Sequence, residues 1–236
     1  MIPLNRFTVP IKKKSNDSSN VTVVLLASIP NPRMKTMPSV SLLNIDKQHN
    51  VIDIQVEAIR AAYPKSDIIL VTGHDSSQVI AKRPNGVRII ENQLYNDCGE
   101  NEEIRLALNN SVTECVLLIN GNCIFNANCL QQLRGHGSCT LVDTKGQMDS
   151  DSIGVIANGS KVENLAYGID SKWCYVSYIE GKEYDLLKKF ASLRNRSNMC
   201  MFESINYIVS NGGVVYTVEQ NAGYLRKISS SKDILI

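Results

Sequence analysis

The sequence has neither a long apolar run nor a surplus of charge of one sign. Among its 236 residues, 25 lysines and arginines stand against 23 aspartates and glutamates, which gives a formal charge of +2. This balance carries no signal for a nucleic-acid surface or an acidic substrate. The longest nearly apolar stretch, residues 21–27, covers about a third of a bilayer span, so we expect no transmembrane helix and no membrane partner.

The cysteine patterns of disulfide-rich and metal-binding proteins are also missing. The seven cysteines are an odd number, with no C-x-x-C pair and no repeated ligand spacing. We interpret them as small buried apolar side chains in a reducing compartment. The chain does not open on a basic segment followed by an apolar one, so we expect a cytoplasmic protein. With 43% apolar residues, a chain of this length can bury a core without cross-links.

Residues 1–20 differ in composition from the rest of the chain. Residues 11–20 are polar, without apolar periodicity, and predict a flexible N-terminal arm. Alternatively, the arm docks as a strand on a protein partner, because apolar residues alternate along it. These residues are Ile2, Leu4, Phe7, Val9 and Ile11. Residues 21–236 show no second break in composition and are predicted to form one α/β domain.

From residue 21 onward, short apolar runs alternate with helical patterns. Strands buried on both faces are predicted at 21–27, 67–72, 87–91 and 115–120. Helices are predicted between or after them at 51–62, 101–108 and 126–133. This order predicts a three-layer α/β/α Rossmann-like fold with a mostly parallel sheet and strand 21–27 near its centre. The second half is less regular, with strands expected at 153–157, 173–177 and 214–218 and helices at 180–194 and 201–210.

The loop after the first strand lies where such sheets bind ligands. Residues 26–46 read LASIPNPRMKTMPSVSLLNID. This segment resembles the first loop of the nucleotidyltransferases of the sugar-nucleotide pyrophosphorylase and cytidylyltransferase type, L-A-A-G-x-G-x-R-M followed by P-K-x-L-L-x-I. The matching residues are Leu26, Ala27, Arg33, Met34, Pro38, Leu42, Leu43 and Ile45.

Weaker matches to the same family follow in the same order. Residues 71–74 resemble its V-T-G-Y segment, 89–92 with Tyr95 its asparagine-bearing segment, and 117–125 its L-L-x-G-D-x-x-F segment. Residues 202–206 resemble Y-E-x-x-x-N and 226–234 resemble the closing E-I-D-T-x-E-D-L. The resemblance implies the nucleotide-diphospho-sugar transferase (GT-A) variant of the fold. It also implies a set of nucleotide-binding residues: Ala27, Ser28, Asn31, Arg33, Asn92, Gly121 and Asn122.

The departures from the family pattern fall where the chemistry should be. Ile29 and Asn31 stand where two glycines let the family's backbone approach a triphosphate, while Pro30 and Pro32 each remove an amide donor. Ser39 aligns with the signature lysine, and Lys35 is poorly spaced to replace it. We therefore expect no phosphate cradle built from backbone amides.

The metal site departs in the same way. The resemblance implies Mg²⁺ held by two aspartates, whose positions here are Asn122 and Ser229. We accordingly predict no catalytic residues, no metal ligands and no cofactor. The predicted function is a binding or assembly module, such as a viral or multi-subunit accessory protein, with at most weak nucleotide binding.

Two other interpretations stay open. The chain could be an active nucleotidyltransferase that joins a nucleotide to a sugar or polyol phosphate, with Mg²⁺ on non-standard ligands. It could also be an unrelated flavodoxin-like module.

For every other group of residues, a purely structural interpretation is favoured over a functional one. The three histidines are scattered, and the acidic residues 97–103 suit the start of a helix better than a replacement metal site. Acidic neighbours raise the pKa expected for Cys98, which disfavours a nucleophile. Arg33 is predicted either to contact a phosphate or to form a surface ion pair.

Overall fold

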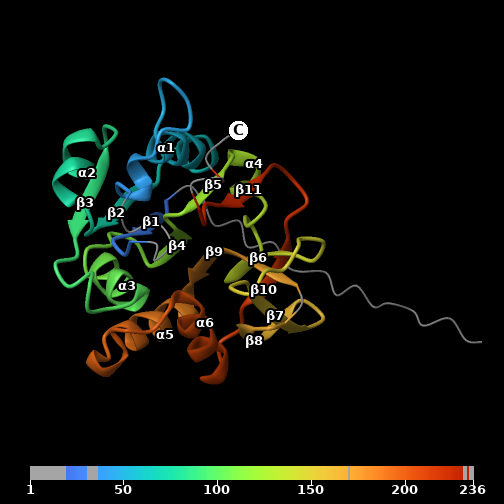
Figure 1. Ribbon diagram of the computed structural model, residues 1–236. Coiled ribbons are helices and arrows are strands. Elements are labelled where there is room, and N and C mark those ends of the chain that lie inside the picture. Colours follow the sequence, from blue (N-terminus) through green and yellow to red (C-terminus); the bar gives the residue numbers. More distant parts are fainter. Residues whose placement is uncertain (1–19, 31–36, 170, 231–232, 234–236) are drawn as a thin grey trace, which may run out of the picture.

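The computed structural model describes residues 20–30, 37–169, 171–230 and 233 (Figure 1). The predicted N-terminal arm lies outside the described residues except for Asn20, and so do the predicted ligand contacts Asn31 and Arg33. Across the described residues, no helix combines the length and apolarity needed to cross a membrane.

Four parallel strands form the first half of the sheet, in the order β3-β2-β1-β4. They are β1 (Thr22–Ala27), β2 (Asp67–Thr72), β3 (Val87–Glu91) and β4 (Cys115–Asn120). The chain builds outward from β1 to β3 and then crosses back, so that β4 lies on the other side of β1. Ligands bind open α/β sheets at such a reversal of strand order, beyond the carboxyl ends of the strands.

The second half of the sheet is not parallel throughout. β9 (Lys172–Glu180) runs antiparallel between β4 and β6 (Cys139–Asp143). Beyond β6 follow β10 (Tyr216–Glu219), β8 (Lys161–Tyr167) and β7 (Ile153–Asn158). The α/β class is confirmed, but the sheet is mixed: β6 and β10 pair in parallel, while β9, β8 and β7 add antiparallel pairings, so the expectation of a mostly parallel sheet is not confirmed. The short link between β7 and β8 accounts for their antiparallel pairing, since parallel neighbours need a long crossover.

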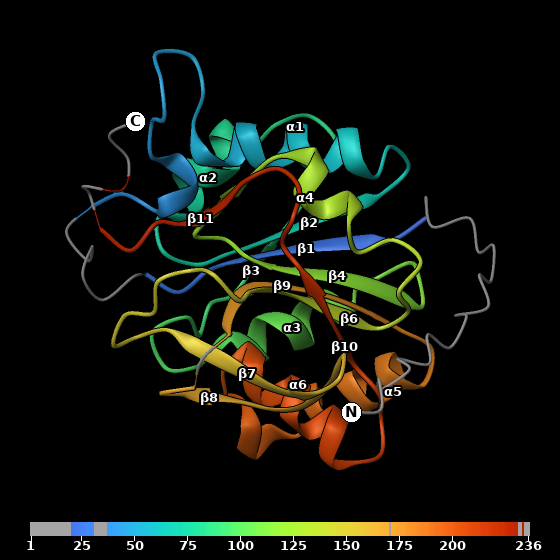
Figure 2. The same ribbon diagram turned by 90° about the vertical axis from the view of Figure 1, so that its right-hand side faces the viewer.

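Helices cover both faces of the sheet (Figure 2). One face carries α1 (Val51–Ala62), α2 (Ser76–Lys82) and α4 (Ala127–Gln131), and the other carries α3 (Glu100–Leu108), α5 (Gly181–Ala191) and α6 (Met201–Ser210). Two short 3-10 helices, Val40–Leu42 and Arg194–Arg196, lie in loops.

A separate two-stranded ribbon brings the C-terminal segment to the end of β4. It pairs β5 (Cys123–Phe125), which directly follows β4, with β11 (Leu225–Lys227). Residues 100 or more positions apart thereby meet beside the point where the strand order reverses.

The strands predicted at 67–72, 87–91 and 115–120 and the helices predicted at 51–62 and 201–210 have the predicted bounds. The other predicted elements are present with shifted ends, the largest shifts being those of the helix predicted at 180–194 and the strand predicted at 173–177. The sequence analysis missed α2, β5, β6, β8 and β11. These elements are short or half exposed; α2, for example, buries only Val79 among its described residues.

Candidate functional site

A cleft of about 490 Å³ opens at the carboxyl ends of β1 and β4. Its walls come from the loop after β1, the start of α3, the end of β4, and β11 with the chain that follows it, and Asp151, Tyr167 and Cys200 add to them from the second half of the fold. Their lining residues include Ile29, Pro30, Glu100, Glu103, Asn120, Asn122, Lys227 and Ser229. The topology therefore forms a cleft where the sequence analysis expects one.

The two positions that align with metal-binding aspartates meet in this cleft. The Ile228 N–H donates to the Asn122 carbonyl over 2.7 Å, which holds Ser229 beside the end of β4. The Asn122 N–H in turn donates to Oδ1 of Asn120 over 3.0 Å. Asn122 and Ser229 both line the cleft, and both are uncharged.

Two carboxylates near these positions, Glu100 and Asp233, accept hydrogen bonds from other groups, and a third, Asp151, also lines the cleft. Glu100 accepts from Asn120 Nδ2 and from the Met201 N–H, both at 2.7 Å. Asp233 accepts from the backbone N–H groups of Ser229 and Ser230 at 2.8 Å. Partial burial acts to raise the pKa of Asp233, but these backbone donors outweigh it and lower the pKa.

The donor set does not suit a divalent cation. Among the described residues, no group of three or more histidine, cysteine or acidic side chains could hold a metal ion. Mg²⁺ favours anionic oxygen ligands, which neither the Asn122 amide nor the Ser229 hydroxyl supplies. The Mg²⁺ that the resemblance implies therefore does not fit these residues.

Glu103 is a buried acid that the sequence analysis did not single out. It is 1% exposed, and its Oε1 accepts the Ser28 N–H over 2.5 Å. Burial, with a smaller contribution from Glu100, raises the pKa of Glu103 to about 8, although hydrogen bonds from Ser28 and Ile29 oppose the shift. The side chain is therefore mostly protonated at neutral pH. It engages backbone amides that a phosphate loop would offer to its ligand.

The described residues among the predicted nucleotide contacts divide into two groups. Asn122 and Ala27 share a small hollow that adjoins the cleft. Ser28 and Asn92 are buried, and Asn92 Nδ2 donates to Ser28 Oγ over 3.0 Å. A Cβ at Gly121 would lie 2.5 Å from the Ala27 Cβ, so only glycine lets β4 leave the sheet this close to β1. Their assignment to nucleotide binding stays a prediction.

Lys227 is a charged residue of the cleft that the sequence analysis missed. Its Nζ lies 3.7 Å from the ring centroid of Tyr175. Burial acts to lower the pKa of Lys227, but Tyr175, Cys123 and Glu100 together outweigh burial, so the net shift of the pKa is upward and the side chain is an ammonium. The only available signal was its place next to Ile228 in the segment that resembles the family's C-terminal motif.

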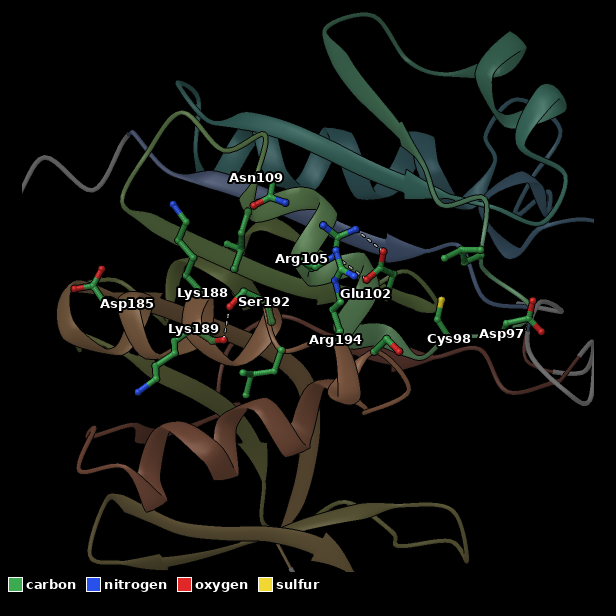
Figure 3. A pocket seen from close by; sticks show the side chains of 15 residues that line it. Asp97, Cys98, Glu102, Arg105, Asn109, Asp185, Lys188, Lys189, Ser192 and Arg194 are labelled. Carbon is green, nitrogen blue, oxygen red and sulfur yellow. Dashed lines mark hydrogen bonds and ion pairs between the residues drawn. The ribbon is translucent and has the colours of Figure 1, made fainter.

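A second hollow, of about 650 Å³, lies on the flank of the molecule between α3 and α5 (Figure 3). Arg105 Nη2 pairs with Glu102 Oε1 at 2.6 Å, while Lys188 and Lys189 extend away from each other. Cys98 lines both this hollow and the cleft. Burial is the main cause of its raised pKa and acidic neighbours add to it, so the expected direction is correct.

Comparison with known proteins identifies the fold. The sequence matches no protein-family model and no curated protein sequence. Among solved structures, the inositol-1-phosphate CTP transferase from T. maritima is similar, with a TM-score of 0.71 and 14% identity over 91% of both chains. The CTP:phosphocholine cytidylyltransferase from Streptococcus pneumoniae gives a TM-score of 0.70 and 16% identity, over 90% of this chain and 95% of that one.

A nucleoside-diphosphate-sugar pyrophosphorylase from Vibrio cholerae RC9 is similar to the same degree. Its TM-score is 0.70 and its identity 12%, over 91% of this chain and 99% of that one. At these identities the similarity shows a shared fold. The resemblance to nucleotidyltransferases is thus confirmed at the level of the fold.

Proposed function

We propose that this chain uses the nucleotidyltransferase fold to bind a phosphorylated ligand weakly and does not transfer a nucleotidyl group. The observation that carries the proposal is the meeting of Asn122 and Ser229 in the cleft at the two positions that align with metal-binding aspartates. Nucleotidyl transfer by this family uses the metal to neutralise phosphate charge. Without carboxylates at both positions, the cleft retains its shape and loses that contribution.

The phosphate loop supports the same proposal. The hydrogen bond of the Ser28 N–H to Glu103, and the proline at position 30, leave the loop with few amides for a triphosphate. A binding or assembly role fits a cleft with this chemistry. The N-terminal arm, with its alternating apolar residues, is the segment that we propose for contact with a protein partner in such an assembly.

A pyrophosphate-release assay tests the proposal directly. Purified protein should release no pyrophosphate from any nucleoside triphosphate in the presence of common sugar 1-phosphates. Its melting temperature should be unchanged by Mg²⁺. Turnover in the usual enzymatic range of about 1–10³ per second would contradict the proposal and favour an active transferase with rebuilt metal ligands.

A variant that restores both carboxylates gives the matched control. Asn122→Asp combined with Ser229→Asp places two acidic side chains in the cleft, so Mg²⁺ should raise the melting temperature of this variant and not that of the wild type. An equal response of both proteins would show that Mg²⁺ binds elsewhere.

A further inference from the structure

Lys227 lies beside the two uncharged positions of the cleft. It is paired with Cys123 in the β5–β11 ribbon, next to Asn122, and it lies two residues before Ser229. Alternate residues of an extended chain point to the same side. Lys227, Ser229 and Asn122 accordingly line the same cleft.

The Tyr175 ring packs against the Lys227 ammonium, and an irregular stretch of β9 places the ring there. Between the pairs Thr140–Ser177 and Val142–Trp173, three residues of β9 oppose one residue of β6. Tyr175 lies within this bulge and has φ of 58°, which is rare for a bulky residue. Bulges of this kind redirect a side chain beside functional sites.

The bulge lies at the end of β4. The last paired residues of β4 and β9 are Ile119 and Val176, so Tyr175 follows at the level of Asn120. Tyr175 is 6% exposed, and its ring centroid lies 3.7 Å from the Lys227 Nζ. A cation stacked on a tyrosine face is attracted by the ring, which favours one position of an otherwise flexible side chain.

The ammonium also lies where two hollows meet. Asp151, Lys227 and Ser229 line both the cleft of about 490 Å³ and a neighbouring hollow of about 250 Å³. A ligand with a phosphate between two organic groups could place the phosphate at Lys227 and one group in each hollow. Asn122 and Ser229 would add uncharged hydrogen-bond donors to the phosphate oxygens.

We propose that the Lys227 ammonium takes the place of the divalent metal in this cleft, which therefore binds a phosphate-bearing ligand without Mg²⁺. The inference rests on the proposed function, because it assumes that the cleft binds such a ligand. A single ammonium neutralises one charge and donates up to three hydrogen bonds, but it does not bridge two phosphates as a divalent ion does. It therefore suits retention of a phosphate better than its transfer.

Calorimetry with nucleoside diphosphates tests the site without assuming a base. ADP, CDP, GDP and UDP are titrated into the full chain, once in EDTA and once in Mg²⁺. The diphosphate that binds should do so with affinities equal within about twofold in the two buffers. Lys227→Met, which keeps the length of the side chain, should weaken binding about ten- to hundredfold, and Lys227→Arg should retain most of it.

Lys182→Met is the matched control. Lys182 is an exposed residue of α5 that lines neither hollow, and its Nζ donates to the Gly212 carbonyl over 2.9 Å. This variant should bind within about twofold of the wild type, whereas an equal loss in both lysine variants would overturn the assignment to Lys227. Circular dichroism verifies that each variant is folded. If Lys227→Met does not fold, the comparison of the two buffers on wild type and Lys227→Arg decides the question.

The outcomes separate the two proposals. Binding that requires Mg²⁺, or that survives Lys227→Met unchanged, overturns the role of Lys227 and leaves the proposed function standing. Failure of all four diphosphates to bind in either buffer overturns the proposed function, and the role of Lys227 with it.

Discussion

Glu103 should make the stability of this protein fall as the pH rises through neutrality. Its carboxyl group is 1% exposed, and burial raises its pKa from the ordinary value of 4.5 to about 8. The folded state therefore holds a proton that the unfolded state has released between these two values. By linkage, the contribution is fully present below about pH 4.5 and is lost as the pH rises through 8.

The size of the effect follows from the two pKa values. At 1.36 kcal/mol per pH unit, the interval from 4.5 to about 8 corresponds to at most about 5 kcal/mol of unfolding free energy. About 3 kcal/mol of this falls between pH 5 and pH 8, because protonation is incomplete at both ends of that range. Urea denaturation at several pH values measures it without changing the ionic strength.

Glu103→Gln isolates the effect. Glutamine has nearly the same shape and can still accept the Ser28 N–H, but it does not ionise. The variant should match the wild type near pH 5 and exceed its stability by about 3 kcal/mol near pH 8. Glu102→Gln, one residue away on the same helix, removes the ion pair with Arg105 and should keep the wild-type pH dependence. Parallel stability curves for wild type and Glu103→Gln would refute the reasoning.

Two further predictions concern packing. Gly121→Ala should destabilise the protein by about 1–3 kcal/mol, because the new Cβ meets Ala27 and the Leu26 carbonyl. Gly135→Ala, whose new Cβ has nothing within 4 Å, should show only the strain of its backbone. Equal losses of unfolding free energy in urea denaturation would contradict this. Of the seven thiols, at most three should react with Ellman's reagent before unfolding, since the other four are buried and out of reach of the reagent; fast reaction of a fourth would refute it. The buried four are Cys123, Cys129, Cys139 and Cys174.

Local pattern was enough to predict the first half of the fold. Strands β2 and β4 and helix α1 have the predicted bounds, because runs buried on both faces and the 3.6-residue period are visible within a short window. Strand β3 also has the predicted bounds, but it lies at the edge of the sheet and buries only Val87, so the expectation that it is buried on both faces was wrong. The resemblance also implied that the positions of Asn122 and Ser229 share a site, and both residues line the cleft.

The tertiary structure alone decided the direction of β9, the bulge that turns Tyr175 and the burial of Glu103. Strand direction in the second half depends on partners distant in sequence, which no local period encodes. A glutamate in an acidic segment is ordinarily solvated, and only the packing of α3 against the loop after β1 removes Glu103 from water. Lys227 likewise gains its place in the cleft from the pairing of β11 with β5, since burial and charge environment are properties of long-range contacts and not of the residue itself.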